Sequence, residues 1–493
     1  MSTAEKQPST WTKTIVASMT SYIDAGSIVA GAAGLAMWQA YLGMSQDQVG
    51  LLNACSANAL SAAVGALIGG RICDLLGRKL VYTYDLLFYI LGMLIIIFSG
   101  SFPMLLAGFA IVGFSVGADV AASWTLIAEN APAENRARHC GTAQLMWALG
   151  PCVVLLLSAI FSFYLYDEVK DNRLKEVIAH EKVVKEEIKT LLSEKENPLT
   201  KTAILQFFQA DLEKTVAERR ELAGGFLIGN RIVFAHLAII AFIVWIMRLR
   251  MPESEEWKSN KEKEKELIEA GVWQKTSYWD LFTNRQNLRG LMLLIGVYMI
   301  WNLAAGTGGG MLPYIYKAAG GITDGQSQAL TALLFGTSCF ATVLIFMTLA
   351  DKYSRRVIYC VIACLYIVAW GLLMLPKEYL GIGIFAMASI LMGINNGTGQ
   401  QAFYQMWAAE MFPARYRAAA QGFSFFTARF CLSIWLFISA NIIGENGEGL
   451  PIAATILVAF ATISMLIGTI FCPNTAGKTL QQIEEERYGK VDK

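Results

Sequence analysis

Long uninterrupted apolar runs constrain this chain more than any other feature of its sequence. Several exceed the roughly 20 residues that a helix needs to cross a bilayer. Of the 493 residues, 55% are apolar and only 16% are charged, whereas about 25% are charged in an average soluble protein. Lys plus Arg (40) nearly balance Asp plus Glu (39), so no basic excess points to nucleic acid. We expect an all-α membrane protein.

Twelve apolar segments are candidate membrane spans, and each should be helical because lipid offers no hydrogen bonds to a free backbone. They cover residues 14–37, 48–70, 80–99, 103–128, 141–166, 225–248, 289–313, 326–349, 357–376, 379–408, 418–442 and 451–472.

Basic residues recur in the short loops after the even-numbered spans, and the loops after the first and third spans have none. Because cytoplasmic loops carry an excess of Lys and Arg, we expect both termini in the cytoplasm and a plasma (inner) membrane location. The predicted parts are a cytoplasmic N-terminus at 1–13, a six-helix bundle at 14–248, a cytoplasmic linker at 249–288, a second six-helix bundle at 289–472 and a cytoplasmic tail at 473–493.

Residues 167–222 interrupt the first bundle with a charged stretch on the outer side. Apolar residues recur there near helical spacing, which predicts a short antiparallel helical pair outside the membrane. The alternative is a solvated, charge-rich loop with no role in transport.

Two charged turns lie six spans apart. After the second span the chain reads Gly70-Arg-Ile-Cys-Asp74-Leu-Leu-Gly77-Arg78-Lys79, and after the eighth it reads Asp351-Lys-Tyr-Ser-Arg355-Arg356. Copies of one turn at this spacing indicate two homologous halves, as in transporters built from repeats. On these residues the chain resembles the major facilitator superfamily, which implies twelve helices in two six-helix bundles.

Further motifs are similar to those of the sugar porter branch of that superfamily. They are Glu129-Asn-Ala-Pro-Ala-Glu-Asn-Arg136, Pro252-Glu253-Ser254, Glu410-Met-Phe-Pro-Ala-Arg-Tyr-Arg417 and the stretch from Pro473 to Glu484. The resemblance implies that these charged turns hold the inner ends of the helices and control gating. It also implies alternating-access transport of a sugar or polyol, with a myo-inositol-like ligand as the candidate.

The resemblance also suggests substrate-binding residues. Gln144 matches the family's substrate glutamine on the fifth span, whereas Trp301 and Asn302 replace its glutamines on the seventh. The tenth span is unusually polar, with Asn395, Asn396, Gln401, Gln405 and Trp407. Each of these side chains either lines the cavity or makes a hydrogen bond that packs helices together. An amide-rich cavity suits a ligand with a hydroxyl on every carbon.

Asp24 lies within the first span, where a charge is costly and marks a functional site. It matches the acid of proton-coupled sugar porters, but the arginine that faces it in the family falls on Phe109. Arg429 on the eleventh span could supply that charge, or it could extend toward the membrane surface. We therefore expect proton symport with Asp24 as the proton carrier. If Asp24 is instead structural, the protein is an uncoupled facilitator.

A transporter-like nutrient sensor is a second alternative. We expect no enzyme activity, cofactor or metal, because the three His are dispersed and no nucleophile–base pair is evident. The expected partners are a sugar or polyol, the proton and membrane lipid, and the expected oligomeric state is a monomer.

Overall fold

The computed structural model describes residues 9–165, 167–193, 198–251, 253–269, 277–320, 322, 324–443 and 447–489. Pro252, the outer parts of both expected termini and the middle of the expected linker lie outside these residues. The described part of the chain is helical and contains no strand.

The first half contains α1 (Thr10–Leu42), α2 (Gln46–Ala54), α3 (Leu60–Leu76), α4 (Arg78–Ile97), α5 (Phe102–Asn130), η1 (Ala133–Asn135), α6 (Arg136–Leu165), α7 (Glu168–Ser193) and α8 (Pro198–Leu249). Two short helices follow, α9 (Glu255–Glu269) and α10 (Asp280–Thr283). The second half contains α11 (Arg285–Gly320), α12 (Asp324–Ala341), η2 (Thr342–Phe346), α13 (Met347–Leu349), α14 (Arg355–Leu372), η3 (Lys377–Tyr379), α15 (Ile382–Thr398), α16 (Gln400–Glu410), α17 (Ala414–Ile443), α18 (Leu450–Phe471) and α19 (Leu480–Tyr488).

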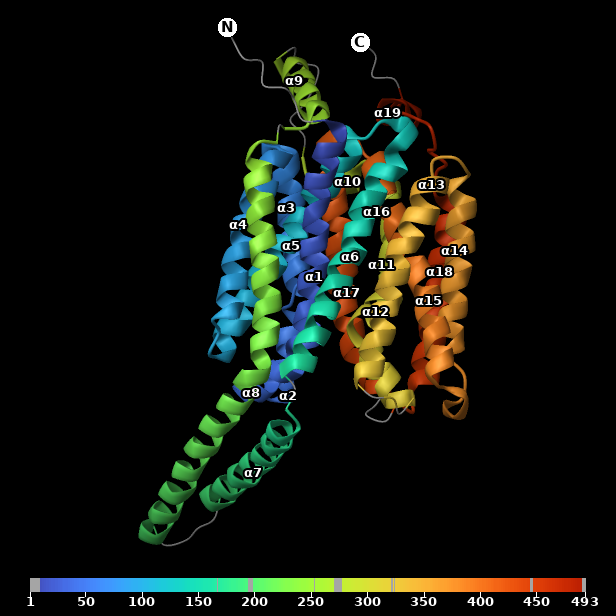
Figure 1. The fold of residues 1–493 in the computed structure, drawn as a ribbon. Coiled ribbons are helices and arrows are strands. Elements are labelled where there is room, and N and C mark those ends of the chain that lie inside the picture. The colour runs from blue at the N-terminus through green and yellow to red at the C-terminus, as the bar shows by residue number, and fades with distance from the viewer. Residues whose placement is uncertain are drawn as a thin grey trace.

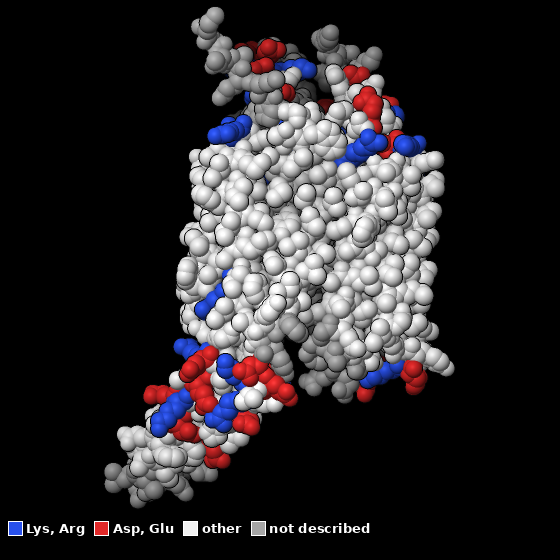
Figure 2. All heavy atoms as spheres, viewed as in Figure 1, with Lys and Arg blue, Asp and Glu red and all other residues white. Residues whose placement is uncertain are grey.

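The two halves stand side by side as helical bundles (Figure 1). The start of α1, α9 and α19 lie at one end, which we call the termini end, and α2 and α7 lie at the opposite or insertion end. On the face shown in Figure 2, charged side chains gather at the two ends and on the α7–α8 projection, and the belt between them has almost none. This is the surface of a multi-pass membrane protein.

Ten helical segments of the described chain are long and apolar enough to cross a membrane. The other two spans are α3, shortened by the break that follows α2, and α17, made more polar by residues such as Gln421 and Arg429. These two helices pack along each other at the contact between the halves. The fold is the expected twelve-helix arrangement in two bundles.

Three of the predicted spans are interrupted. Residues 55–59 separate α2 from α3, and the hydroxyl of Ser56 donates to the carbonyl of Asn53 (2.8 Å) while accepting from the N–H of Asn58 (3.3 Å). Such local bonds compete with the helical backbone pattern. Gly399 separates α15 from α16, and a π-helical turn, η2, follows α12. The hydroxyl of Thr342 in this turn donates to the carbonyl of Gly397 (3.0 Å). The π-helical turn therefore contacts the end of α15, beside the break at Gly399.

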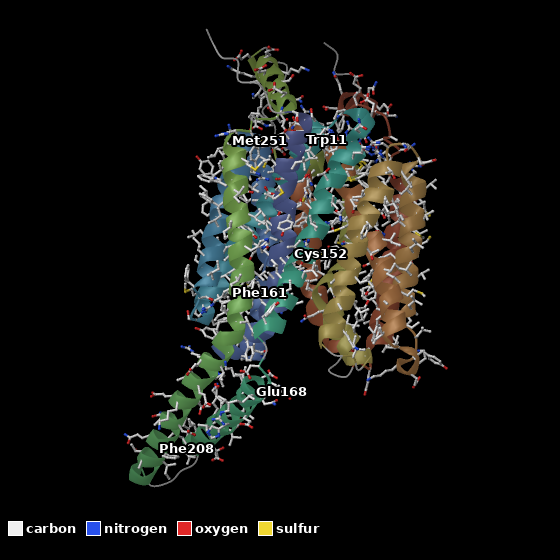
Figure 3. All side chains as sticks on the ribbon, viewed as in Figure 1. Trp11, Cys152, Phe161, Glu168, Phe208 and Met251 are labelled. Atoms are coloured by element: carbon white, nitrogen blue, oxygen red, sulfur yellow. The ribbon has the colours of Figure 1, made fainter. Side chains whose placement is uncertain are left out.

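The α7–α8 projection is a helical hairpin that extends beyond the bundle, with Glu168 near its base and Phe208 farther out along it (Figure 3). Its second helix continues from the hairpin into the membrane span without a break. This helix, α8, has 52 residues and is about 78 Å long at 1.5 Å per residue. The buried guanidinium of Arg219 donates to Glu181 of α7 (2.6 Å) and to the carbonyl of Ala40 near the end of α1. Arg219 therefore bonds the two helices of the hairpin to each other and to α1.

Candidate functional site

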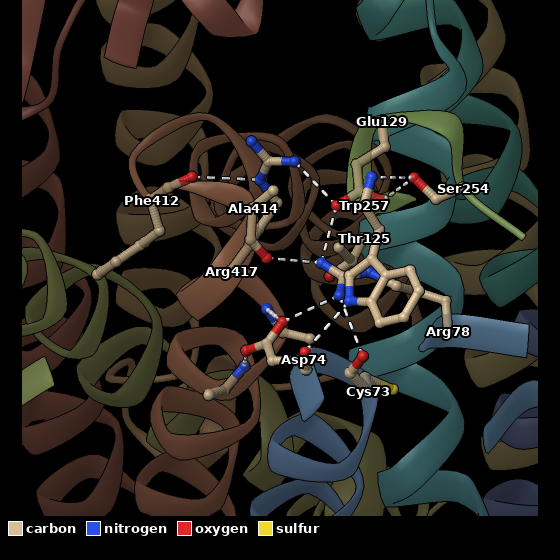
Figure 4. A network of polar contacts seen from close by, with 12 residues as sticks. Cys73, Asp74, Arg78, Thr125, Glu129, Ser254, Trp257, Phe412, Ala414 and Arg417 are labelled. Atoms are coloured by element: carbon tan, nitrogen blue, oxygen red, sulfur yellow. Dashed lines mark hydrogen bonds and ion pairs between the residues drawn. The ribbon is translucent and has the colours of Figure 1, made fainter. Parts of the chain in front are cut away.

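A buried charge network lies at the termini end of the first half (Figure 4). Arg78 is the first residue of α4, and its guanidinium contacts Asp74 (3.2 Å) and Glu129 at the end of α5 (2.9 Å). The side chains of all three residues are at most 1% exposed. Together with Arg417 they form what we call the first network.

The first network connects the two halves. Arg417 of α17 donates to the carboxylate of Glu129 (2.9 Å), and the carboxylate of Asp74 accepts the N–H groups of Ala418 (3.2 Å) and Ala419 (2.7 Å). Both N–H groups lie within six residues of the start of α17, so Asp74 is bound to the N-terminal part of that helix. Separating the halves at this end would break all of these bonds.

The second half repeats this arrangement in what we call the second network. Arg355 donates to both oxygens of Glu410 (2.9 Å each) and contacts Asp351 (3.3 Å). Arg136, from the first half, donates to Glu410 (2.8 Å), and Asp351 accepts the N–H of Ala137 (3.0 and 3.1 Å). The arginines are exchanged, since each glutamate binds one arginine from its own half and one from the other.

The loop carboxylate of Asp351 is less buried than its counterpart. Its side chain is 11% exposed, against 1% for Asp74. Partial burial raises the pKa of Asp351 above its usual value, and the N–H of Ala137 and the guanidinium of Arg355 act in the opposite direction. Asp351 is thus the member of the two networks that bulk water reaches most easily.

The glycines of the first motif allow close backbone contacts. A Cβ on Gly70 would lie 2.4 Å from the carbonyl oxygen of Ala418, and one on Gly77 would lie 2.2 Å from the carboxylate of Glu253. Gly77 also has φ +106°, a conformation that favours glycine. The carboxylate of Glu253 accepts the N–H groups of Arg78 (3.1 Å) and Lys79 (3.0 Å), so it caps the start of α4.

The linker and the tail attach to different networks. In the linker, Ser254 donates to Glu129 (2.6 Å) and Trp257 donates to the carbonyl of Asp74 (3.1 Å). In the tail, the hydroxyl of Thr475 accepts from Arg355 (2.7 Å) and donates to Glu410 (2.5 Å). The side chain of Arg356 donates to the carbonyl of Cys472, where the tail begins.

Polar side chains from both halves meet between the bundles. Gln144 of α6 donates to the carbonyl of Asn396 (2.6 Å) and accepts from the side chain of Gln405 (3.0 Å). The side chain of Asn396 donates to Ser338 of α12 (3.2 Å). Within the described residues the side-chain nitrogens of Asn302 and Gln401 are buried and have no hydrogen-bond partner, which is unusual for buried donors.

Other expected substrate residues bond within the second half. The indole of Trp301 donates to Asn395 (3.0 Å), whose amide donates to Gln400 (2.7 Å). Trp407 lies elsewhere than expected, because its ring packs on Phe403 and Tyr359 with centroids 5.2 and 5.5 Å away. These contacts place Trp407 inside the second bundle, away from the first half.

An aromatic group, absent from the sequence-based list, bridges the halves. The rings of Tyr298 and Tyr404 are stacked with centroids 3.9 Å apart, and Trp124 of the first half lies edge-on to Tyr404 and Phe425 (6.4 Å each). The indole of Trp124 donates to Ser21 of α1 (3.2 Å). Their positions on four different helices give no common signal in the sequence.

The structure does not pair Asp24 with Arg429. Arg429 donates to the side chain and the carbonyl of Asn58 and lies over the ring of Phe425 (4.8 Å). The guanidinium that acts electrostatically on Asp24 is that of Arg248. This correction arises because Arg248, at the end of a span, looks in the sequence like an ordinary loop charge.

Phe109 stands where related porters carry an arginine, and it packs as an apolar side chain. Its ring lies edge-on to Phe234 of α8 (5.8 Å) and directly against Gly31 of α1, where a Cβ would come within 2.8 Å. A small crevice between α1, α6 and α8, also bordered by Gln328 of α12, lies nearby toward the insertion end.

Comparisons with known proteins agree with this architecture and define its class. Residues 4–177 match the family model described as Sugar (and other) transporter, and residues 222–436 match the model described as Major Facilitator Superfamily. The chain belongs to the sugar transporter family of this superfamily.

Individual relatives support the assignment. The chain is 44% identical over 479 residues to the "Minor myo-inositol transporter IolF" of Bacillus subtilis (strain 168), covering 97% of this chain and 94% of the relative. It is 25% identical to the "Putative metabolite transport protein YfiG" of the same organism, covering 87% and 83%. The fold matches the proton:xylose symporter XylE bound to 6-bromo-6-deoxy-D-glucose, with a TM-score of 0.67, 16% identity and coverage of 97% and 99%.

Proposed function

We propose that this protein moves a cyclic polyol of the myo-inositol type across the membrane by alternating access, together with a proton. The name of the 44% identical relative supports the substrate class. The observation that carries the proposal is the contact of Gln144 with Gln405 and Asn396 between the halves. Transporters built from two repeats bind substrate near the membrane midplane at this interface.

The chemistry of this contact suits a neutral polyhydroxylated ring. Amides both donate and accept hydrogen bonds, as hydroxyl groups do, and the unpartnered donors of Asn302 and Gln401 are available to a ligand. Tyr298, Tyr404 and Trp124 add flat apolar surface beside them. We assign substrate binding to these amide and aromatic side chains. Asn395 and Trp301 hold them in position.

The two charge networks act as the gate at the termini end. They tie the first turns of α6 and α17 to the opposite half, so this conformation is closed at that end. We assign the termini end to the cytoplasm of a plasma (inner) membrane on the strength of its basic loops, and we propose that the protein works as a monomer in lipid.

Sidedness has a direct test in a cysteine-free background. Lys189→Cys on the hairpin should react with an impermeant thiol reagent added outside intact cells, whereas Lys265→Cys on α9 should react only after permeabilisation. The reverse pattern would overturn the assigned orientation.

Asp24 is the proposed proton carrier. It is 3% exposed, and its Oδ2 has no hydrogen-bond partner among the described residues. Since an unpaired buried carboxylate is costly, a proton should occupy it for part of the transport cycle. Uncoupled facilitation is the second candidate, because Phe109 leaves the fourth membrane span without the family's arginine.

Uptake by reconstituted protein tests the proposal. Labelled myo-inositol should accumulate in proteoliposomes under an inward proton gradient, and a protonophore should abolish the accumulation. Asp24→Asn should still exchange labelled for unlabelled substrate without concentrating it. If accumulation never occurs but equilibration does, the protein is a facilitator, and if neither occurs for a panel of sugars and polyols, the substrate class is wrong.

A further inference from the structure

A second group of ionisable side chains lies inside the first bundle, between Asp24 and the termini end. Arg248 of α8 donates to Asp119 of α5 (2.7 Å) and lies 3.8 Å from Asp85 of α4. Its other nitrogen donates to Thr20 of α1 (2.9 Å) and Ser123 of α5 (2.7 Å). Asp85, Asp119 and Arg248 are 6%, 3% and 1% exposed.

This group adjoins Asp24. Thr20 and Asp24 are four residues apart on α1, so they share a face of the helix one turn apart. Asp85, Asp119 and Arg248 are also the charged side chains that act electrostatically on Asp24. Toward the termini end, Asp85 lies seven residues after Arg78, the first residue of α4, which is about 10 Å along the helix.

The bonding within the group is unequal. Asp119 is well satisfied, because one of its oxygens accepts from both Arg248 and Ser123 (2.7 Å each). Asp85 accepts the N–H of Leu86 (2.7 Å) and lies 3.8 Å from Arg248, and its Oδ2 is buried with no hydrogen-bond partner among the described residues. The group thus has one oxygen free to take up a proton.

The charge balance of the buried groups also indicates that Asp85 can bind a proton. Asp24, Asp85 and Asp119 are three buried carboxyl groups, and within the described part of the chain Arg248 is the one guanidinium bonded among them. Two uncompensated charges in a medium of low dielectric constant cost far more than binding protons does. Asp119 is held ionised by its ion pair, so the proton-accepting groups are Asp24 and Asp85.

Other titratable groups face these acids from the surrounding helices. Tyr82 of α4 lies under the guanidinium of Arg248 (5.2 Å), and Tyr89 of α4 donates to the carbonyl of Ile23 (3.0 Å). Tyr22 of α1 bonds His236 of α8 (3.1 Å), and Cys73 and Glu253 lie farther toward the termini end. None of them bonds the free oxygen of Asp85.

We propose, on the basis of the proton symport proposed above, that Asp85, Asp119 and Arg248 form a second proton-binding site that exchanges protons between Asp24 and the termini end. In the transfer, the carboxyl group of Asp24 loses its proton and becomes a carboxylate, while Oδ2 of Asp85 gains the proton and becomes neutral. Arg248 compensates the carboxylate of Asp119 throughout, while the second negative charge moves from Asp85 to Asp24 as the proton moves the other way. Asp85 then releases the proton toward the termini end.

Asp85→Asn and Asp85→Glu test the relay in proteoliposomes. Counterflow at equal pH needs no net proton release, so Asp85→Asn should retain it, while gradient-driven accumulation should fall to simple equilibration. A pH-sensitive dye inside the vesicles should show that substrate no longer brings protons in. Asp85→Glu should restore both accumulation and proton entry, and Glu176→Gln, an exposed acid on α7, should behave like the wild type.

The outcomes separate the relay from the symport itself. If the wild type accumulates substrate and Asp85→Asn does so equally well, the relay is wrong and the symport stands. If Asp85→Asn loses counterflow as well, Asp85→Glu decides, since accumulation in that variant supports the relay and equilibration without accumulation overturns it. If the wild type ignores the proton gradient, the symport fails and the relay with it.

Discussion

The first and second networks make the same set of bonds in two different surroundings. In each network, a glutamate binds two arginines, one from each half. An aspartate in each network accepts backbone N–H groups from the opposite half. Asp74 is enclosed by the contact of α3 with α17 and by Trp257, whereas Asp351 remains partly open to water. The bonding pattern is therefore a property of the repeat, and its strength is set by burial.

The largest expected effect is that of removing a shared carboxylate. Glu129→Gln should leave Arg78 and Arg417 buried with too little negative charge, which costs about 3–5 kcal/mol for a broken buried pair. Transport should fall severely, and the termini end should open. Glu410→Gln is the matched variant and should act as strongly. Normal transport by either variant would show that its network is not the gate.

Substitution of the aspartate should have a larger effect in the first network than in the second. Asp74→Asn loses charge at a fully enclosed site and should weaken the closed state by about 2–3 kcal/mol. Asp351→Asn, at a site that water reaches, should change the stability of the closed state by no more than about 1 kcal/mol. Transport rates and thermal unfolding of the two purified variants provide the measurement. Equal losses would contradict the role assigned to burial.

The tail should support only the second network. Thr475→Val keeps the shape of the side chain but removes one hydrogen bond to Glu410, which is worth about 1 kcal/mol. Ser254→Ala is the matched change at Glu129. Each should lower the unfolding temperature modestly, and the effects of Thr475→Val and Glu410→Gln should add up incompletely, because both act on the hydrogen bond between these two side chains. Full additivity would argue against a shared network.

The smallest expected effect is a pH dependence through Asp351. Burial raises the pKa of this carboxyl group, and opening the gate would expose it and return its pKa toward the usual value. The closed state therefore binds a proton more tightly, so acidifying the termini side should favour closure. Thiol labelling of an interface cysteine should slow on acidification in the wild type and change less in Asp351→Asn. Acid-induced opening through this residue would contradict the sign.

Much of the fold could be predicted because a membrane span is a long local signal. The breaks at 55–59 and at Gly399 could not, since they depend on side chains such as Ser56 that bond to their own backbone or on contacts from another helix. The sequence does not show that α8 is one continuous helix, because its outer part is charged like a loop and its inner part is apolar like a membrane span.

The site could be predicted only in part, for a related reason. The structure brings Gln144 and Gln405 together, but which face of the tenth span points to the other half could not be read from spacing, and Trp407 lies inside the second bundle. Arg248 does not stand out in the sequence, because basic residues at the ends of spans usually mark cytoplasmic loops. Its partner Asp119 lies within the predicted span 103–128, and only the structure joins the two.

We propose that Arg136 and Arg417, each bound to a glutamate of the opposite half, hold the termini end closed. A distance measurement across that end tests this most directly. Spin labels at Glu134→Cys and Tyr353→Cys, in a cysteine-free background, report on the separation of the halves. We predict one short distance in the parent and an added longer distance when Glu129→Gln or Glu410→Gln is introduced. An unchanged single distance in both variants would contradict the claim.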